Sequence, residues 1–366
     1  MEHREHPRPV GVRWFGFAAV TLLWFDVFLY SATVAVMGET FLPAGDRAWA
    51  GVIALSSIGV TVLFRPWGAL LGGWLADRWG RRPVALLALA AGAVTAVLAL
   101  LPPYAAIGAV APVMVLVVRA LQGLAAGAIW PSFVVLVVES APQGRRATDG
   151  ALCQAGVPAG LLLCLGSIWM AQSVTTPAGY ADWGWRLPSL LALGLALLAI
   201  WGLSFGGLRE SPVFERLRSQ QRVCRRPFVH AVRSGWASIL GIAVVTVVAS
   251  MLSVVMLGGF ISAFVEGLDA GLSWVDGQLA LAFGATIWLA TVLVGGPLAD
   301  RLGARRVLLF SLVFLTASSL PFVSLLETAS LLSIYAAMVL IGVGAGLCTA
   351  SRPAFVVGRF VAAHRG

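Results

Sequence analysis

The sequence contains very little charge. Only 11% of its 366 residues are charged, against about 25% in an ordinary soluble domain, and 59% are hydrophobic. Lysine is absent, and all 25 basic residues are arginines scattered between apolar runs. This composition excludes a soluble domain, a disordered chain and a nucleic-acid-binding surface, and no nucleic acid is expected as a partner. It predicts an integral membrane protein.

Side chains with reactive chemistry are equally scarce. The four cysteines form no C-x-x-C pair, so neither a disulfide framework nor a metal centre is indicated. The four histidines all lie near predicted polar segments. Ser–His–Asp, His–Cys and metal-ligand patterns are missing from the sequence. We therefore expect a protein that is not an enzyme and that needs no cofactor.

Long apolar runs dominate the rest of the chain. A helix crosses a bilayer with about 20 apolar residues, and ten runs of that kind predict an all-α, multi-pass bundle. The first run is too long for a cleavable signal peptide and is typical of a membrane anchor. The ten runs cover residues 14–37, 50–75, 83–102, 110–138, 150–172, 187–208, 236–264, 277–299, 307–326 and 330–350.

The arginines predict the orientation of these spans. If the N-terminus lies in the cytoplasm, the cytoplasmic segments contain 21 of the 25 arginines, which is a strong positive-inside signal. We expect both termini in the cytoplasm of a bacterial cell, with the chain in the inner membrane. The longest polar stretch then divides an N-terminal six-helix bundle (1–208), a cytoplasmic linker (209–235) and a four-helix C-terminal bundle (236–366).

One short segment occurs twice. Gly73-Trp-Leu-Ala-Asp-Arg-Trp-Gly80 returns 223 positions later as Gly296-Pro-Leu-Ala-Asp-Arg-Leu-Gly303, and six of the eight residues match. Arg82 aligns with Arg305 two residues further on. Each copy lies where an apolar run ends. An internal repeat in a membrane protein is typical of a transporter made of two similar helix bundles.

These segments resemble the signature between helices two and three of the major facilitator superfamily. Further motifs resemble its metabolite:H⁺ symporter subgroup, whose members take up organic acids or compatible solutes. They are Trp24-Phe-Asp26, Phe64-Arg-Pro-Trp-Gly68, Leu101–Pro112, Arg119-Ala-Leu-Gln122-Gly123, Glu139–Arg146, Gln154–Gly160, Trp183–Pro188 and Glu210-Ser-Pro-Val-Phe214.

The resemblance assigns the repeated segments to gating. It implies that Asp77 closes the cytoplasmic side against the start of helix eleven, and that Asp300 does so against the start of helix five. A carboxylate suits a helix start because it accepts hydrogen bonds from the unpaired N–H groups there. A simple anchoring turn is the alternative. The candidate gating residues are Gly73, Asp77, Arg78, Gly80, Arg82, Asp300, Arg301, Gly303 and Arg305.

Asp26 is the candidate proton-coupling residue. It lies 12 residues into the first run, roughly 18 Å deep at 1.5 Å per residue. A carboxylate at that depth costs about 2.5–3.5 kcal/mol, so it should face a cavity or a partner. A carboxyl group can carry a proton, whereas arginine cannot release one. A static ion pair is the alternative.

Arg119 and Arg65 are the candidate anchors for a substrate, because a guanidinium binds a carboxylate in a bidentate manner. Two cations against Asp26 leave a positive site and favour a small organic anion. Gln122, Trp24 and Trp130 complete the predicted substrate site. Arg65 has helix packing or snorkelling as an alternative, and the tryptophans have interface or packing roles.

The sequence departs from the family pattern at two carboxylates and in length. Leu23 stands where the family usually has Glu, and Ile129 stands at another family Glu. The chain ends in what resembles the loop after helix ten, so we expect helices eleven and twelve to be missing. The leading function is proton-coupled uptake by alternating access, with protons, a small molecule and the lipid bilayer as partners. A truncated non-transporting paralogue, a gene fragment or an exporter of the same fold are alternatives, and the oligomeric state is open.

The topology is directly testable. A green fluorescent protein fused after Gly366 should be fluorescent, and an alkaline phosphatase at the same position should be inactive, because the arginine distribution places this end in the cytoplasm. Phosphatase activity there would contradict the predicted count of ten spans.

Overall fold

The computed structural model describes residues 10–41, 47–205, 272–328 and 330–363, together with positions 210, 215, 236, 240–243 and 247. Within these residues every regular element is a helix, so the predicted all-α class is confirmed. Most of the expected linker (209–235) and of the expected span 236–264 lies outside the described residues.

The N-terminal helices occupy residues 10–205. Several consecutive elements join into one long helix, such as Val110–Ser140 and Arg146–Val174. The elements are α1 (Val10–Phe41), α2 (Arg47–Trp79), α3 (Arg81–Ala93), η1 (Val94–Leu100), α4 (Tyr104–Ile107), α5 (Val110–Ile129), η2 (Trp130–Val134), α6 (Val135–Ser140), α7 (Arg146–Gln154), α8 (Gly156–Val174), α9 (Pro177–Gly179), η3 (Tyr180–Gly184) and α10 (Arg186–Phe205).

The C-terminal helices are α14 (Trp274–Leu302), α15 (Ala304–Glu327) and α16 (Leu331–Ala363). The last helix extends past the predicted end of its apolar run at residue 350. Arg352, which follows the last predicted apolar run, therefore lies inside α16. Arg352 is nevertheless accommodated inside the helix, and its guanidinium reaches the Gln154 amide on α7 when that amide is oriented to satisfy its neighbours.

Among the described helices, six are long and apolar enough to cross a membrane, or seven if the pair Pro177–Gly184 and Arg186–Trp201, bent by 46°, is counted as one span. The predicted count of ten spans is therefore not confirmed. The described helices do cover nine of the ten predicted runs, but some of them carry charged residues or are broken, as α3 and η1 are.

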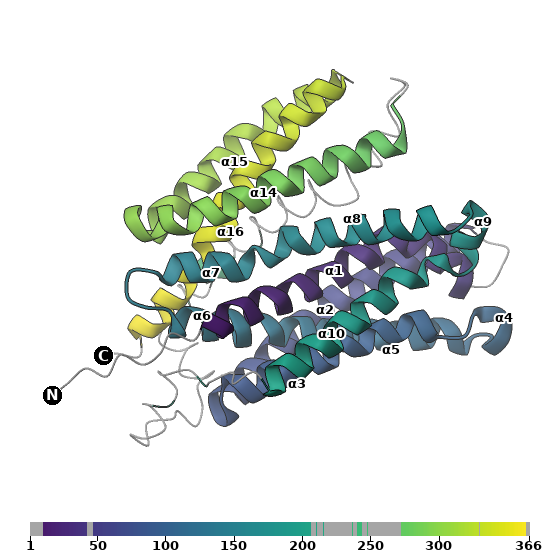
Figure 1. The fold of residues 1–366 in the computed structure, drawn as a ribbon, viewed down its shortest axis with the longest axis horizontal. Helices are drawn as coiled ribbons and strands as arrows, with labels where there is room; N and C mark the ends of the chain where they lie inside the picture. Colours follow the sequence, from purple (N-terminus) through teal and green to yellow (C-terminus); the bar gives the residue numbers. More distant parts are fainter. Residues whose placement is uncertain are drawn as a thin grey trace.

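The two groups of helices meet along α7 and α8. Figure 1 shows α14, α15 and α16 on one side of the molecule, with α7 and α8 between them and the other N-terminal helices. The contact is close: a Cβ atom added at Gly296 would lie 2.9 Å from the Cα of Thr148. Gly150 is packed in the same way against Pro353 of α16. Residues near the start of helix α7 thus touch both α14 and α16.

Helices α2 and α5 cross with their backbones in contact. A Cβ added at Gly68 would lie 2.0 Å from the carbonyl oxygen of Leu124, and one added at Gly127 would lie 2.1 Å from that of Arg65. Only glycine fits such a crossing, as in other membrane helix pairs. Thr61 on α2 also donates a hydrogen bond to the Arg119 carbonyl at 3.2 Å. The crossing fixes the positions of Arg65 and Arg119 relative to each other.

The repeated sequence segments have the same backbone geometry. Gly80 follows α2 with a φ of 101°, and Gly303 follows α14 with a φ of 94°. The N–H of Gly80 donates to Ala76 at 3.1 Å, and that of Gly303 donates to Ala299 at 3.0 Å. A positive φ at the end of a helix favours glycine. Each copy therefore ends one long helix and starts the next, α3 or α15, within one residue.

The glycine crossing predicts a large loss of stability on substitution. Gly127→Val should lower the free energy of unfolding by about 1–3 kcal/mol or more, because its side chain would overlap the α2 backbone. Thermal unfolding of the purified protein in detergent measures the effect. Gly166→Ala is the control, since a Cβ there meets no atom within 4 Å. Equal melting temperatures for the two variants would contradict the crossing.

Candidate functional site

A buried arginine on α5 organises the first candidate site. The Arg119 side chain is 2% exposed, and Gln122, one turn later on the same helix, is 1% exposed. Nη1 of Arg119 donates a hydrogen bond to Oε1 of Gln122. The guanidinium carbon also lies 3.4 Å from the ring centre of Tyr30 on α1. These contacts hold a permanent positive charge inside an apolar bundle.

Asp26 on α1 supplies the negative charge of this site. Its carboxylate attracts the guanidinium groups of both Arg119 and Arg65. Arg65 comes from α2, and its guanidinium lies 5.7 Å from the ring centre of Trp24. The structure therefore brings together five of the candidate site residues, Asp26, Arg65, Arg119, Gln122 and Trp24, from three helices.

The two arginines keep unused donors. Nε of Arg65 and Nε of Arg119 are buried and have no hydrogen-bond acceptor among the described residues. A buried N–H without an acceptor costs about 1–3 kcal/mol. An acceptor that entered the site would therefore be bound favourably.

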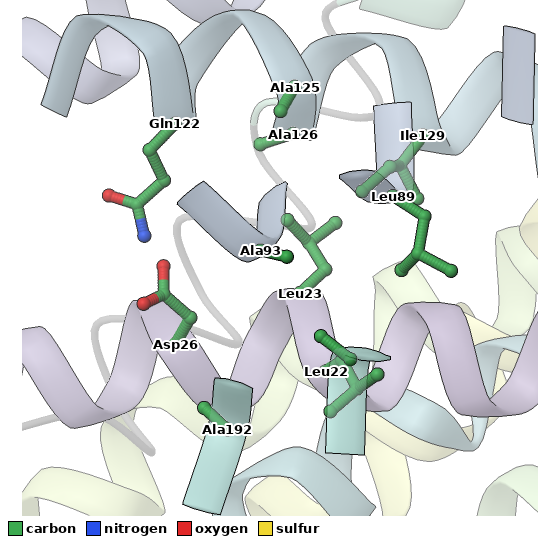
Figure 2. Close-up of a pocket in the computed structure, with 11 residues that line it drawn as sticks. Leu22, Leu23, Asp26, Leu89, Ala93, Gln122, Ala125, Ala126, Ile129 and Ala192 are labelled. Atoms are coloured by element: carbon green, nitrogen blue, oxygen red, sulfur yellow. The ribbon is translucent and has the colours of Figure 1, made fainter. Parts of the chain in front are cut away.

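A small cavity lies beside Asp26. It has a volume of about 30 Å³ and is lined by Asp26, Gln122 and nine Leu, Ile or Ala residues from α1, α3, α5 and α10. Figure 2 shows the carboxylate of Asp26 and the amide of Gln122 pointing toward each other across one end of this cavity. Leu23 and Ile129, the two positions where the sequence resemblance implies carboxylates, both line it. Asp26 is the one carboxylate among the lining residues.

Trp130 lies in a second polar cluster and does not line the cavity. With the amide of Gln154 oriented to satisfy its neighbours, its oxygen accepts from Nε1 of Trp130 and from Nη2 of Arg352, each at 3.2 Å. Trp130 begins the π-helical turn η2, which includes Pro131. Such turns often occur at functional sites. This cluster joins η2 and α7 to α16 across the contact between the two groups of helices.

Asp300 on α14 makes another contact between the N-terminal and C-terminal groups of helices. Its Oδ1 accepts from the Ala147 N–H at 2.8 Å, and its Oδ2 accepts from the Thr148 N–H at 2.9 Å and from the Thr148 hydroxyl at 2.6 Å. The acceptor carboxylate thus caps the start of α7, where N–H groups have no partners within the helix. This is the helix start that the resemblance assigned to Asp300.

The first repeat copy has a different arrangement. Glu210 accepts from the N–H groups of Arg81 and Arg82 at 3.0 Å each, so it caps the start of α3. Arg81 also forms an ion pair with Glu139 at 2.8 Å. Asp77 lies near the end of α2 and is half-buried.

The remaining predicted gating residues lie around the same turns. Arg78 lies against the ring of Trp74, with its guanidinium carbon 5.5 Å from the ring centre. Gly73 is half-buried, whereas Arg301 and Arg305 are exposed.

Sequence reasoning assigned no role to Glu210, Glu139, Gln154 or Arg352. The two glutamates have a recognisable signal, since each is acidic in an arginine-rich segment at the end of an apolar run. Gln154 and Arg352 have none, because their pairing depends on how α16 packs against α7. Tyr30 was missed because one tyrosine in an apolar run is indistinguishable from a packing residue.

The fold and these sites define a multi-span membrane transport protein rather than an enzyme. The sequence profile of the Major Facilitator Superfamily matches residues 16–366. The chain belongs to this superfamily.

Curated relatives agree with this assignment. The chain is 31% identical to the shikimate transporter of Escherichia coli (strain K12) over 322 residues, which is 86% of this chain and 72% of the relative. It is 26% identical to the proline/betaine transporter of the same strain over 332 residues, covering 87% of this chain and 65% of the relative.

Solved structures show the same fold. The proton:xylose symporter XylE bound to 6-bromo-6-deoxy-D-glucose superposes with a TM-score of 0.73 at 16% identity, covering 93% of this chain and 80% of that chain. XylE from E. coli in an inward open conformation gives a TM-score of 0.61 at 17% identity, with 96% and 88% covered.

The Asp300 contact predicts a measurable opening. Asp300→Asn removes the charge and one acceptor, and a hydrogen bond to a charged group contributes about 1.5–3 kcal/mol. A cysteine placed at Ser351, which is buried on α16, should then react at least about tenfold faster with a maleimide, since 1.4 kcal/mol is a factor of ten.

The labelling experiment uses vesicles and a background whose native cysteines are replaced by alanine. Asp276→Asn is the matched control, because Asp276 caps the opposite end of the same helix α14. Equal labelling rates in the two variants would mean that the Asp300 contact does not hold the groups together.

Proposed function

We propose that this protein takes up a small organic anion together with protons by alternating access. The observation that supports the proposal best is the site at Asp26, where the buried guanidinium of Arg119 and the partly buried guanidinium of Arg65 lie beside a carboxylate and each has an Nε–H without an acceptor among the described residues. Secondary transporters place such intramembrane charges where substrate and coupling ion bind.

The anion would bind at Arg119 and Arg65. When Asp26 is ionised, its negative charge partly neutralises the two arginines. When Asp26 is protonated, it no longer neutralises either of them. A bound proton therefore strengthens the attraction for an anion, and by linkage a bound anion favours the proton. That reciprocity is what symport requires. Gln122 would position Arg119 through their hydrogen bond.

Relatives support an organic acid as substrate. The shikimate transporter, named for a carboxylate, is 31% identical to this chain. The proline/betaine transporter supports a second candidate, a zwitterion, at 26% identity. The apolar residues at Leu23 and Ile129 favour the anion, because the cavity offers no further carboxylate to bind a cationic group.

Closure of the cytoplasmic side would rest on the contacts between the two groups of helices. In this proposal Asp300 at the start of α7 and the cluster of Trp130, Gln154 and Arg352 hold the groups together and must separate for substrate to leave. Trp130 then acts in closure and not in substrate contact. In this proposal these contacts lie toward the cytoplasm and the protein lies in the inner membrane, which the distribution of arginines supports. Export through the same site would use the same contacts in reverse.

The proposal predicts that Asp26→Asn loses gradient-driven accumulation of substrate but keeps substrate exchange. At one proton per substrate, one pH unit provides about 1.4 kcal/mol, a tenfold accumulation. The variant mimics a permanently protonated site, so accumulation in proteoliposomes should fall to the level without a gradient. Exchange of labelled for unlabelled substrate should persist. Radiolabelled shikimate, other carboxylates and betaine form the test panel.

Asp276→Asn serves as control because Asp276 lies at the start of α14, in a capping box with Ser273 and away from Asp26. Undiminished gradient-driven uptake by Asp26→Asn would overturn the coupling role. Accumulation of betaine without transport of shikimate or any other net-anionic carboxylate would select the zwitterion instead.

A further inference from the structure

The apolar parts of the three C-terminal helices contain a single charged residue. In residues 277–299, 307–326 and 331–358 that residue is Arg352. It lies in the span Leu331–Arg359, seven residues before the last residue of that span, which is about 10 Å inside the end of the span at 1.5 Å per residue. Burying an arginine in a membrane span is costly, so such a residue indicates a functional site.

Arg352 lies at the contact between the two groups of helices. Helix α16, which carries it, packs against α7, and Figure 1 shows the two side by side. The residue is half-buried as a whole, and its Nε atom is buried. On the same helix Ser351 is fully buried and Cys348 is 2% exposed. The guanidinium therefore points into the contact with the N-terminal helices.

Two donors from opposite groups of helices converge on one oxygen at this contact. With the Gln154 amide oriented as described above, Nε1–H of Trp130 and Nη2–H of Arg352 both donate to its oxygen, each at 3.2 Å. The amide is neutral, so it accepts a hydrogen bond without neutralising the guanidinium. A carboxylate does both, and hydrogen bonds that involve ionised groups are about twice as strong as neutral ones. A carboxylate that reached Arg352 would therefore displace the amide.

Movement between the groups gives a carboxylate access to Arg352. Gln154 and Trp130 belong to the N-terminal helices, whereas Arg352 belongs to α16. When the groups separate, as the proposed function requires, Trp130 keeps its contact with Gln154 and Arg352 loses its own. The guanidinium then lies on the C-terminal side of the opened site, whereas Arg119 and Arg65 lie on the N-terminal side.

We propose that Arg352 is a second anion-binding residue, which binds a carboxylate of the substrate after Gln154 has moved away and before the substrate leaves. The inference rests on the proposed function and adds a residue of the C-terminal helices to its substrate site. The amide and the anion compete for the same guanidinium. A bound anion therefore favours the separated arrangement, and loss of the amide favours the anion.

The test is equilibrium binding of two carboxylate probes, radiolabelled shikimate and radiolabelled benzoate, to the purified protein without a pH gradient. We expect Arg352→Gln to weaken the binding of both probes at least about tenfold, because a hydrogen bond to a charged group is lost. Gln154→Leu removes the competing amide, so it should strengthen the binding of both probes at least about threefold.

The opposite signs distinguish binding from closure. If Arg352 only holds the groups together, both variants loosen the same contact and change the affinity in the same direction, which would overturn the proposal. Arg359→Gln is the matched control, because Arg359 is exposed on the same helix and its guanidinium carbon lies 5.5 Å from the ring centre of Phe355. Equal weakening by this variant would also overturn the proposal.

Arg119→Gln separates this inference from the proposed function. If Arg119→Gln loses probe binding and Arg352→Gln keeps it, the second site is refuted and Arg119 remains the anchor. If Arg352→Gln alone loses it, the second site is supported and the role of Arg119 is contradicted. If Arg352→Gln does not fold, Gln154→Leu decides: stronger probe binding supports the proposal, and unchanged or weaker binding refutes it.

Discussion

The cost of keeping arginine charges in an apolar interior shapes the N-terminal half of this protein. Arg119 cannot release its proton, so the fold must surround its charge with acceptors and rings. Gln122, Tyr30 and Asp26 come from two helices to do so. The requirement explains why α1 must lie against α5, and why Asp26 sits deep in a helix that is otherwise apolar.

Helix starts impose a second constraint, because their N–H groups need acceptors where water is scarce. At α3 the acceptor is Glu210 and at α7 it is Asp300. Both carboxylates accept hydrogen bonds from backbone N–H groups at a helix start, but they connect different parts of the chain. Glu210 follows the N-terminal helices, whereas Asp300 belongs to α14. Capping of α7 therefore links the two groups of helices, because the acceptor for one group's backbone is a side chain of the other group.

Sequence reasoning reached the helical class, the family and the grouping of Asp26 with Arg65 and Arg119, because buried charges and repeated motifs are rare and specific. Its assignment of Trp130 to the substrate site stays a prediction; in the structure Trp130 lies beside Gln154 and does not line the cavity at Asp26. It also ended helix ten before Arg352. Both features depend on contacts between elements that are not neighbours in the sequence, and such contacts leave no periodic signal in either helix. The count of spans depended on hydropathy alone and is not confirmed.

The crossing of α2 and α5 has a mechanical consequence. Where backbone meets backbone, as at Gly68 and Gly127, there are no flexible side chains to rearrange when one helix slides past the other. We therefore expect the two helices to move together, with little change in the separation of Arg65 and Arg119. On the proposed function, this fixed spacing would set which distance between charged groups a ligand can match, and adaptation to ligands of different length would have to come from the opposite wall of the site.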